Sequence, residues 1–389
     1  MVQNAMTDEQ MHRTLIGRRG SRSELNTPVL LVDLDALKRN IARMARFAEA
    51  KGLALRPHTK THKSAHIAQL QRDAGAVGFS CAKLGEAEVL ADQGLTLGLL
   101  LTSPVVSVPA IKRLVALNRQ TEDLMCVVDN PKNVRDLGEA AKESGKNLNV
   151  LIDIDPGIHR TGVTSPEKAV ELLDEVRRAE SLSYMGVQFY CGVQQHIANY
   201  SERKAAMCER AVYLRSVLSA LTAADAPPVI VTGCGTGTHR IDAGLDLYTE
   251  LQVGSFVFMD SQYLDCDIMG DGTPAFETSL MVEASVISAN SPGMITLDCG
   301  YKTLSTDGSL TRVISGAPRE ARFVFMGDEH GALIFDENWA DNQPLHLGDR
   351  IVMTTPHCDP TVNLYDFYHV IQGDTLTAIW PVSGRGRSR

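Results

Sequence analysis

Residues 229–238 read VIVTGCGTGT, a short hydrophobic run followed at once by a loop with three glycines at alternate positions. The run is typical of a buried β-strand, and the glycines let the backbone turn tightly and approach a ligand closely. Backbone N–H groups and threonine hydroxyls at such a strand end can bind an anion. The spacing differs from that of dinucleotide-binding glycine motifs and of P-loops, so we expect neither kind of nucleotide site.

The same unit, a hydrophobic run and then a helix or a long loop, recurs from Thr27 to Asp260. The clearest helix is predicted over 35–50, because its hydrophobic residues recur every three or four positions. Repeated βα alternation favours a parallel sheet, and about eight units favour a closed TIM barrel, with an open doubly wound sheet as the alternative. The first of nine runs is then the extra strand. The predicted strands are 29–32, 53–56, 77–80, 97–101, 125–128, 149–154, 185–189, 229–232 and 252–257.

After about residue 265 the pattern changes to short β-like segments bounded by Gly, Pro, Asp and Asn, with no helical period. We therefore expect an α/β barrel over 27–264 and a second, β-rich domain over 265–389, which residues 1–26 join. The segments are 280–288, 294–298, 322–326, 349–355 and 376–382.

Composition excludes several classes of protein. The chain has 389 residues and a net charge of −9, which argues against a basic surface for nucleic acid. No hydrophobic run reaches the length of a membrane helix, and the N-terminus lacks the hydrophobic stretch of a secretory signal. The eight cysteines are scattered without a C-x-x-C pair, as in proteins with reduced thiols. We therefore expect a cytoplasmic protein without nucleic-acid or membrane partners.

Unusual residues follow the predicted strands, where barrel enzymes carry their reactive groups. Segment 56–63, RPHTKTHK, places two lysines among other basic side chains. Nearby cations and desolvation can lower the pKa of such a lysine, which then forms a Schiff base with a carbonyl. A basic surface loop is the alternative reading.

Two further strands are followed by DIDPGIHRTGV (153–163) and YCGVQQH (190–196). Arg160 comes after two acids and a Pro-Gly turn and can point into the barrel mouth, although most arginines in such a pattern are solvated. Tyr190 offers an aromatic face and a hydroxyl. His196 titrates near neutrality and can act as a general base, with a structural role as the alternative.

A phosphate site is predicted from the loop 232–238 together with Gly254 and Ser255. These segments follow the seventh and eighth strands of the barrel count, where TIM barrels commonly bind phosphate. A tight βα turn without a ligand is the alternative.

Segment 356–363, PHCDPTVN, contains a candidate metal pair in the β-rich domain. His357 and Asp359 are two residues apart, so on an extended segment both side chains share one face and Cys358 points away. Imidazole plus carboxylate suits a borderline or hard divalent ion such as Mn, Zn or Mg. An isolated H-x-D is also common by chance.

Taken in order, R-P-H-x-K-x-H-K, the Gly-Thr-Gly loop, a V-G-S-F turn and P-H-x-D-P-T-x-N resemble the D-threonine aldolase group. That group is similar to D-3-hydroxyaspartate aldolase and to metal-activated D-serine dehydratases, all with the alanine-racemase-like fold. The resemblance runs from Thr27 to the final WPVSGRGRSR and implies a barrel that binds pyridoxal phosphate (PLP), plus a β domain. It also implies that strand 29–32 joins the β domain.

The resemblance implies roles for individual residues. Lys60 would carry PLP covalently, Arg160 would face the ring nitrogen and Tyr190 would line the cofactor. His196 would be the catalytic base, and segment 301–313 would lie near the substrate side chain. The phosphate would be bound by Thr236, Gly237, Thr238, Gly254 and Ser255, and the divalent metal (Mn, Mg, Zn or Co) by His357 and Asp359.

The expected activity is PLP- and metal-dependent cleavage of a small β-hydroxy-D-amino acid to glycine and an aldehyde, by a homodimer. Dehydratase relatives usually have His and Cys two residues apart, whereas Asp359 stands at the second position here, which favours the aldolase branch. Cys234 departs from the family, which usually has glycine there. Cleavage of D-3-hydroxyaspartate, dehydration to a keto acid and ammonia, and a non-catalytic PLP protein are the alternatives. The natural substrate and the metal stay open.

Overall fold

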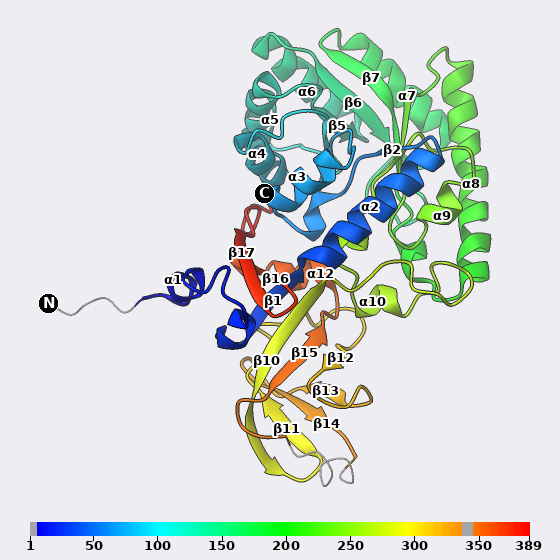
Figure 1. Ribbon diagram of the computed structural model, residues 1–389. Coiled ribbons are helices and arrows are strands. Elements are labelled where there is room, and N and C mark those ends of the chain that lie inside the picture. The colour runs from blue at the N-terminus through cyan, green and yellow to red at the C-terminus, as the bar shows by residue number, and fades with distance from the viewer. Residues whose placement is uncertain (1–5, 337–344) are drawn as a thin grey trace, which may run out of the picture. The chain divides into compact units, whose positions relative to one another are not determined.

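The computed structural model describes residues 6–336 and 345–389. Contacts within the chain divide it into two compact units, each assembled from separate stretches of sequence (Figure 1). The described residues of the β unit lie within Met1–Asn40, Val257–Asp265 and Phe276–Arg385. The barrel unit comprises Ile41–Phe256, Cys266–Ala275 and Gly386–Arg389.

The barrel unit is built on eight parallel strands, counted over its described residues, that pair in the order β2-β9-β8-β7-β6-β5-β4-β3. The two ends of this order meet, because His58 bridges to Ser80 and the Ser80 N–H donates to the Pro57 carbonyl over 2.9 Å. The predicted parallel, TIM-like α/β architecture is confirmed, and the open-sheet alternative is wrong. The strands are β2 (Ala54–Leu55), β3 (Phe79–Cys81), β4 (Leu99–Leu101), β5 (Met125–Val128), β6 (Leu148–Asp153), β7 (Leu182–Phe189), β8 (Ile230–Gly233) and β9 (Glu250–Leu251).

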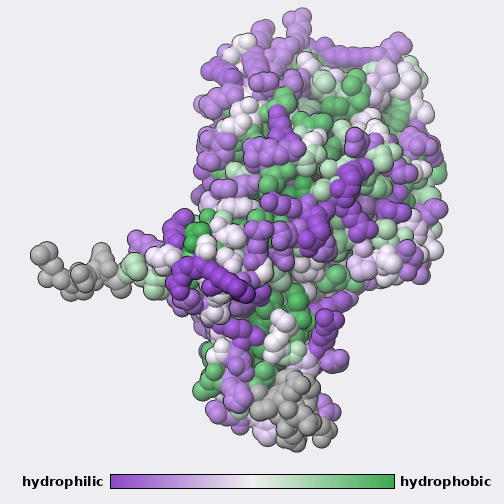
Figure 2. Space-filling model, viewed as in Figure 1, coloured by the Kyte–Doolittle hydropathy of each residue, from purple (hydrophilic) through white to green (hydrophobic). Residues whose placement is uncertain are grey.

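Helices follow most of these strands and lie outside them (Figure 1). Ser107, Ser165 and Asn199 each cap the next helix by accepting a hydrogen bond from a backbone N–H in its first turn. Hydrophilic side chains are spread over the outer helices of this unit (Figure 2). No helix among the described residues has the length and hydrophobicity to cross a membrane. The helices are α2 (Leu34–Ala50), α3 (Ala65–Asp73), α4 (Leu84–Asp92), α5 (Val108–Gln120), α6 (Pro131–Ser144), α7 (Pro166–Arg178), α8 (Tyr200–Ala223) and α9 (His239–Asp242).

The last predicted barrel strand is wrong in position. The strand found here is β9 (Glu250–Leu251), and residues 255–257 form a 3₁₀ turn, η4 (Ser255–Val257), instead of the strand expected over 252–257. The reason is packing at Gly254, where a Cβ atom would lie 2.5 Å from Thr61 Oγ1. The chain turns here against the loop that follows β2, so the ladder ends early.

The β unit contains a nine-stranded sheet, as far as the described residues show. Its first strand, β1 (Val29–Asp33), pairs antiparallel with β10 (Leu280–Ser291) and parallel with β16 (Phe367–Gln372). Three strands that the sequence pattern missed, β12, β14 and β16, complete the sheet. The other strands are β11 (Met294–Leu297), β12 (Val313–Ser315), β13 (Arg322–Phe325), β14 (Gly331–Ile334), β15 (Arg350–Thr354) and β17 (Thr375–Pro381).

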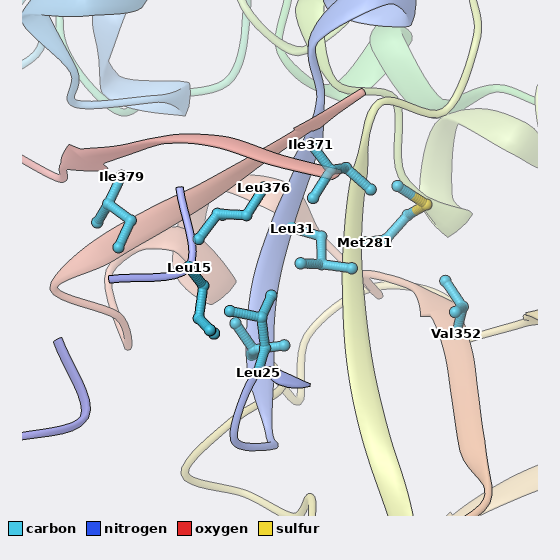
Figure 3. Packing of buried hydrophobic residues seen from close by; sticks show 9 residues of the cluster. Leu15, Leu25, Leu31, Met281, Val352, Ile371, Leu376 and Ile379 are labelled. Carbon is cyan, nitrogen blue, oxygen red and sulfur yellow. The ribbon is translucent and has the colours of Figure 1, made fainter. Parts of the chain in front are cut away.

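One hydrophobic cluster joins the start of the chain to this sheet (Figure 3). Leu15 and Leu25 lie between the N-terminal elements α1 (Asp8–Arg13) and β1, and they pack with Leu31 and Ile371. Burying leucine side chains contributes roughly 1.5–3 kcal/mol each. The segment before β1 is therefore part of the β unit's core. Residues 1–5, which were expected to join this domain too, lie outside the described residues.

Candidate active site

Lys60 lies in η2 (Thr59–Thr61), a 3₁₀ turn that follows β2 at the carboxyl end of the barrel. The backbone of this turn is tied to the sheet, because the His58 N–H donates to the Val253 carbonyl over 3.0 Å. The His58 ring also contacts the Thr102 hydroxyl, with 3.1 Å between Nε2 and Oγ1. The lysine that the sequence singled out is thus carried by a fixed turn at the strand ends, where barrel enzymes hold reactive groups.

The two predicted phosphate segments lie together, as expected from the strand count. The Phe256 N–H donates to Thr236 Oγ1 over 2.9 Å, which joins the loop after β8 to the turn after β9. That turn also packs against the Lys60 loop at Gly254, next to Thr61 Oγ1. The Thr61 hydroxyl is buried and has no hydrogen-bond partner among the described residues. An orphaned buried hydroxyl beside a glycine turn fits a bound polar group such as a phosphate.

Gly237 and Thr238 also make hydrogen bonds within the chain, and their role in binding phosphate stays a prediction. The Gly237 N–H donates to Gln195 Oε1 over 3.0 Å, and the Thr238 hydroxyl donates to Asp242 Oδ2 over 2.5 Å while it accepts from Gln195 Nε2 over 2.9 Å. These donors are already engaged inside the loop. Gln195 is fully buried, and a Cβ on Gly237 would lie 2.0 Å from its carbonyl oxygen. Both residues shape the loop, which leaves Thr236, Gly254 and Ser255 as the stronger phosphate candidates.

Arg160 and Tyr190 lie close together, while their roles at the cofactor stay predictions. The Arg160 guanidinium carbon lies 5.7 Å from the centre of the Tyr190 ring, within range of a cation–π contact. Both line a small hollow with Asp153, whose pKa burial raises to about 6 against hydrogen bonds from Thr161 and Gln188. The hollow therefore places an aromatic face, a cation and a carboxyl next to one another.

His196 ends the short turn η3 (Val193–His196) and is exposed. It directly follows Gln195, the buried glutamine that contacts Gly237 and Thr238 in the loop after β8. Its role as a base stays a prediction.

The candidate metal pair lies in the β unit. His357 is the N-cap residue of α12 (Cys358–Val362), so Asp359 lies in the first turn of a helix. The expectation of an extended segment with both side chains on one face is therefore wrong, because the chain coils directly after His357. Helix geometry still brings the two groups together, with 3.8 Å between His357 Nε2 and Asp359 Oδ2.

This separation fits a divalent ion. It is too long for a hydrogen bond. It is shorter than the distance of about 4.2 Å between two ligand atoms on opposite sides of a metal, each about 2.1 Å from it. Within the described residues no three His, Cys, Asp or Glu side chains form a metal-binding group. Two protein ligands would leave further coordination positions for water or a substrate oxygen.

Asp307 is a residue of this site that the sequence reasoning did not single out. Its Oδ2 lies 2.7 Å from His357 Nδ1, across 50 positions of sequence. Only the expectation that 301–313 lies near the substrate pointed to its neighbourhood. Asp260 similarly accepts the Cys358 N–H over 2.8 Å and fixes the start of α12.

Known protein families match both the barrel region and the β-rich region of the chain. Residues 32–262 match the family described as "Alanine racemase, N-terminal domain", and residues 279–371 match a serine dehydratase domain family. The chain is similar to 3-hydroxy-D-aspartate aldolase of Paracoccus denitrificans (strain Pd 1222), with 34% identity over 94% of this chain and 93% of that protein.

Two solved structures extend the likeness. The crystal structure of D-threonine aldolase from Filomicrobium marinum has a TM-score of 0.88 and 35% identity, covering 94% of this chain and 96% of that one. D-threo-3-hydroxyaspartate dehydratase from Delftia sp. HT23 has a TM-score of 0.79 and 27% identity, covering 92% of this chain and 98% of the other. A variant of a dehydratase of that name is described in a metal-free form.

Proposed function

The chain belongs to the alanine-racemase-like family of PLP-dependent enzymes, in the group of D-amino acid aldolases and dehydratases, and from this premise we propose that it is an aldolase. The proposed reaction cleaves a β-hydroxy-D-amino acid to glycine and an aldehyde. The observation that carries the proposal is the pair of His357 Nε2 and Asp359 Oδ2, 3.8 Å apart. An imidazole and a carboxylate together suit a divalent ion that acts on a hydroxyl group.

PLP supplies an electron sink for the charge left on Cα when a bond to that carbon breaks. Lys60 would attach the cofactor, and Tyr190 would line it. Arg160 would face the ring nitrogen and keep it unprotonated, because a fixed guanidinium opposes a second positive charge nearby. Thr236, Gly254 and Ser255 would bind the phosphate.

A divalent ion supplies positive charge that lowers the pKa of a hydroxyl group. His357 and Asp359 would hold this ion, and its identity, among Mn, Mg, Zn and Co, belongs to the test. His196 would accept the proton of the substrate's β-hydroxyl as the Cα–Cβ bond breaks. The electron pair of that bond stays on Cα, which takes up a proton to give glycine, and the former β-carbon leaves as the aldehyde.

Two narrower alternatives concern the same residues. The substrate of the aldolase is either D-threonine-like or 3-hydroxy-D-aspartate, since relatives of both names share about a third of their residues with this chain. The second alternative is dehydration to a keto acid and ammonia, and the serine dehydratase match over residues 279–371 is the observation that supports it. A homodimer, expected from the resemblance, and a location in the cytoplasm, expected from the composition, form part of the proposal.

A product assay tests the proposal. Purified protein with PLP and Mn²⁺ is incubated with D-threonine, both D-3-hydroxyaspartate diastereomers and D-serine, with the L-isomers as controls. Glycine plus an aldehyde from a D-isomer is the expected result, and the substrate with the highest kcat/KM identifies the specificity. A keto acid plus ammonia would replace the aldolase with a dehydratase. No product from any of these compounds would contradict both.

A further inference from the structure

The ring of His357 has two nitrogens, and the structure gives each a different neighbour. Nδ1 lies 2.7 Å from Asp307 Oδ2, and Nε2 lies 3.8 Å from Asp359 Oδ2. An ionised carboxylate only accepts hydrogen bonds, so the hydrogen between His357 and Asp307 belongs to Nδ1. In the neutral ring Nε2 then keeps its lone pair, on the side where Asp359 lies.

Asp307 is held against His357 by its own loop. Two residues before it, the Ser305 hydroxyl accepts the His357 N–H and donates to the His357 carbonyl, both over 3.2 Å. The Thr361 hydroxyl donates to the same carbonyl over 2.8 Å and accepts the Ser305 N–H over 3.2 Å. The backbone of His357 is therefore fixed from both sides by the segment that carries Asp307.

Gly308 lets this segment turn directly after Asp307. Its φ is +88°, a backbone conformation that side-chain-bearing residues rarely adopt. A Cβ there would lie 3.3 Å from the Pro356 carbonyl oxygen and 3.5 Å from His357 Cβ. The loop thus packs directly against Pro356 and His357.

We propose that Asp307 is a positioning residue of the metal site. It fixes the Nδ1–H tautomer of His357 and the orientation of its ring, so that Nε2 presents a lone pair to a divalent ion held with Asp359. Carboxylates that accept the second N–H of a metal-binding histidine raise its basicity and commonly change metal affinity 10- to 100-fold. The inference rests on the proposed function, which requires a metal, and it adds Asp307 to the residues that prepare the metal site.

The alternative is an ordinary surface ion pair. The Asp307 side chain is 56% exposed, and exposed pairs contribute little to stability. A surface pair would leave metal affinity unchanged when removed. The Asp366 carboxylate provides a matched control, because it is also exposed in the β unit and lies 2.7 Å from Arg385 in an ion pair that does not include His357.

The test measures Mn²⁺ binding to the full PLP-loaded chain, by the electron paramagnetic resonance signal of free Mn²⁺. Asp307→Ala is expected to weaken binding roughly 10- to 100-fold. Asp307→Asn, which still accepts a hydrogen bond from Nδ1, should recover most of that loss, and Asp366→Ala should bind as the unchanged chain does. With Co²⁺ at saturation, the visible spectrum of Asp307→Ala should differ from that of the unchanged chain, because the imidazole ligand is reoriented.

Unaltered Mn²⁺ affinity and Co²⁺ spectrum in a folded Asp307→Ala protein would overturn the inference while leaving the proposed function intact. An equal loss in Asp366→Ala would also overturn it, since any lost surface charge would then have the same effect. An unchanged chain that binds no Mn²⁺ would refute both this inference and the metal part of the proposed function. The product assay is independent of these binding measurements, so it tests the proposed reaction separately.

Discussion

The loop after β8, in the barrel unit, belongs to the candidate cofactor site (the cofactor half), and the start of α12, in the β unit, carries the candidate metal pair (the metal half). The two are held in different ways. The first is packed around the fully buried Gln195, with a glycine where any side chain would collide. The second is held by Ser305 and the partly exposed Asp307 from a distant loop. Close packing makes the cofactor half rigid and intolerant of added atoms. Side-chain hydrogen bonds make the metal half adjustable and sensitive to the loss of single groups.

The largest expected effect separates the two halves by removing the lysine. Lys60→Ala should abolish activity and the visible absorption band of lysine-bound PLP, because no other amine of the turn is placed to replace it. Lys63→Ala is the control, since Lys63 lies three residues away and interacts with Ser388 and Glu86. Absorption spectra of the two PLP-loaded variants check this. A band that survives in Lys60→Ala would refute the assignment.

The next effect concerns the metal half alone. Asp359→Ala should keep the absorption band of bound PLP and lose metal-dependent activity by more than about 100-fold, because a direct ligand is removed rather than an outer one. Activity is measured with and without Mn²⁺ and in the presence of a chelator. A variant that keeps full activity in chelator would show that the pair binds no functional metal.

A smaller effect tests the packing of the cofactor half. Gly237→Ala places a Cβ 2.0 Å from the Gln195 carbonyl oxygen, so the loop must shift. We expect PLP to bind about 10-fold more weakly, with a loss of about 1–3 kcal/mol in the free energy of unfolding. Gly244→Ala, where the nearest atom would be 3.4 Å away, should change neither quantity. PLP titration and urea unfolding check both, and equal behaviour of the two variants would contradict the packing argument.

The last prediction concerns the stability of the β unit at acidic pH, and it expects the smallest change in activity at neutral pH. His12 Nδ1 lies 2.8 Å from His369 Nε2, and burial lowers the pKa of both rings, that of His369 to about 4. The unfolded chain therefore binds more protons than the folded chain between about pH 6.5 and 4, so stability falls as the pH falls through this range. The pair contributes up to about 3 kcal/mol to this loss.

Urea unfolding at pH 7 and pH 5 measures this loss. His12→Gln keeps an acceptor for the Asn26 N–H, which donates to His12 Nε2, and should show a smaller decrease than the unchanged chain. The comparison cancels the opposite contribution of Asp242 in the barrel unit, whose pKa burial raises to about 7. The same decrease in both proteins would exclude the histidine pair as the cause.

The sequence located most of the barrel because its signals are local. A run such as 229–232 is hydrophobic on both faces, as strands covered by helices are, and the glycines that follow it mark the turn. The helix predicted over 35–50 appears as α2 within one residue. The last strand was misplaced because its end depends on a contact between Gly254 and Thr61, nearly two hundred residues apart. No local pattern reports such a contact.

The order of chemistry-bearing residues along the chain was thus determined by the sequence: a lysine after the first barrel strand, glycine turns after the last two, and an H-x-D in the β unit. Tertiary structure alone decided which groups are available and how they are oriented. It engaged Thr238 with Asp242 and Gln195, and it placed Asp307 against His357. The physical reason is that periodicity and glycine turns act within a few residues, whereas the state of a hydroxyl or an imidazole depends on which distant partner the folded chain brings within 3 Å.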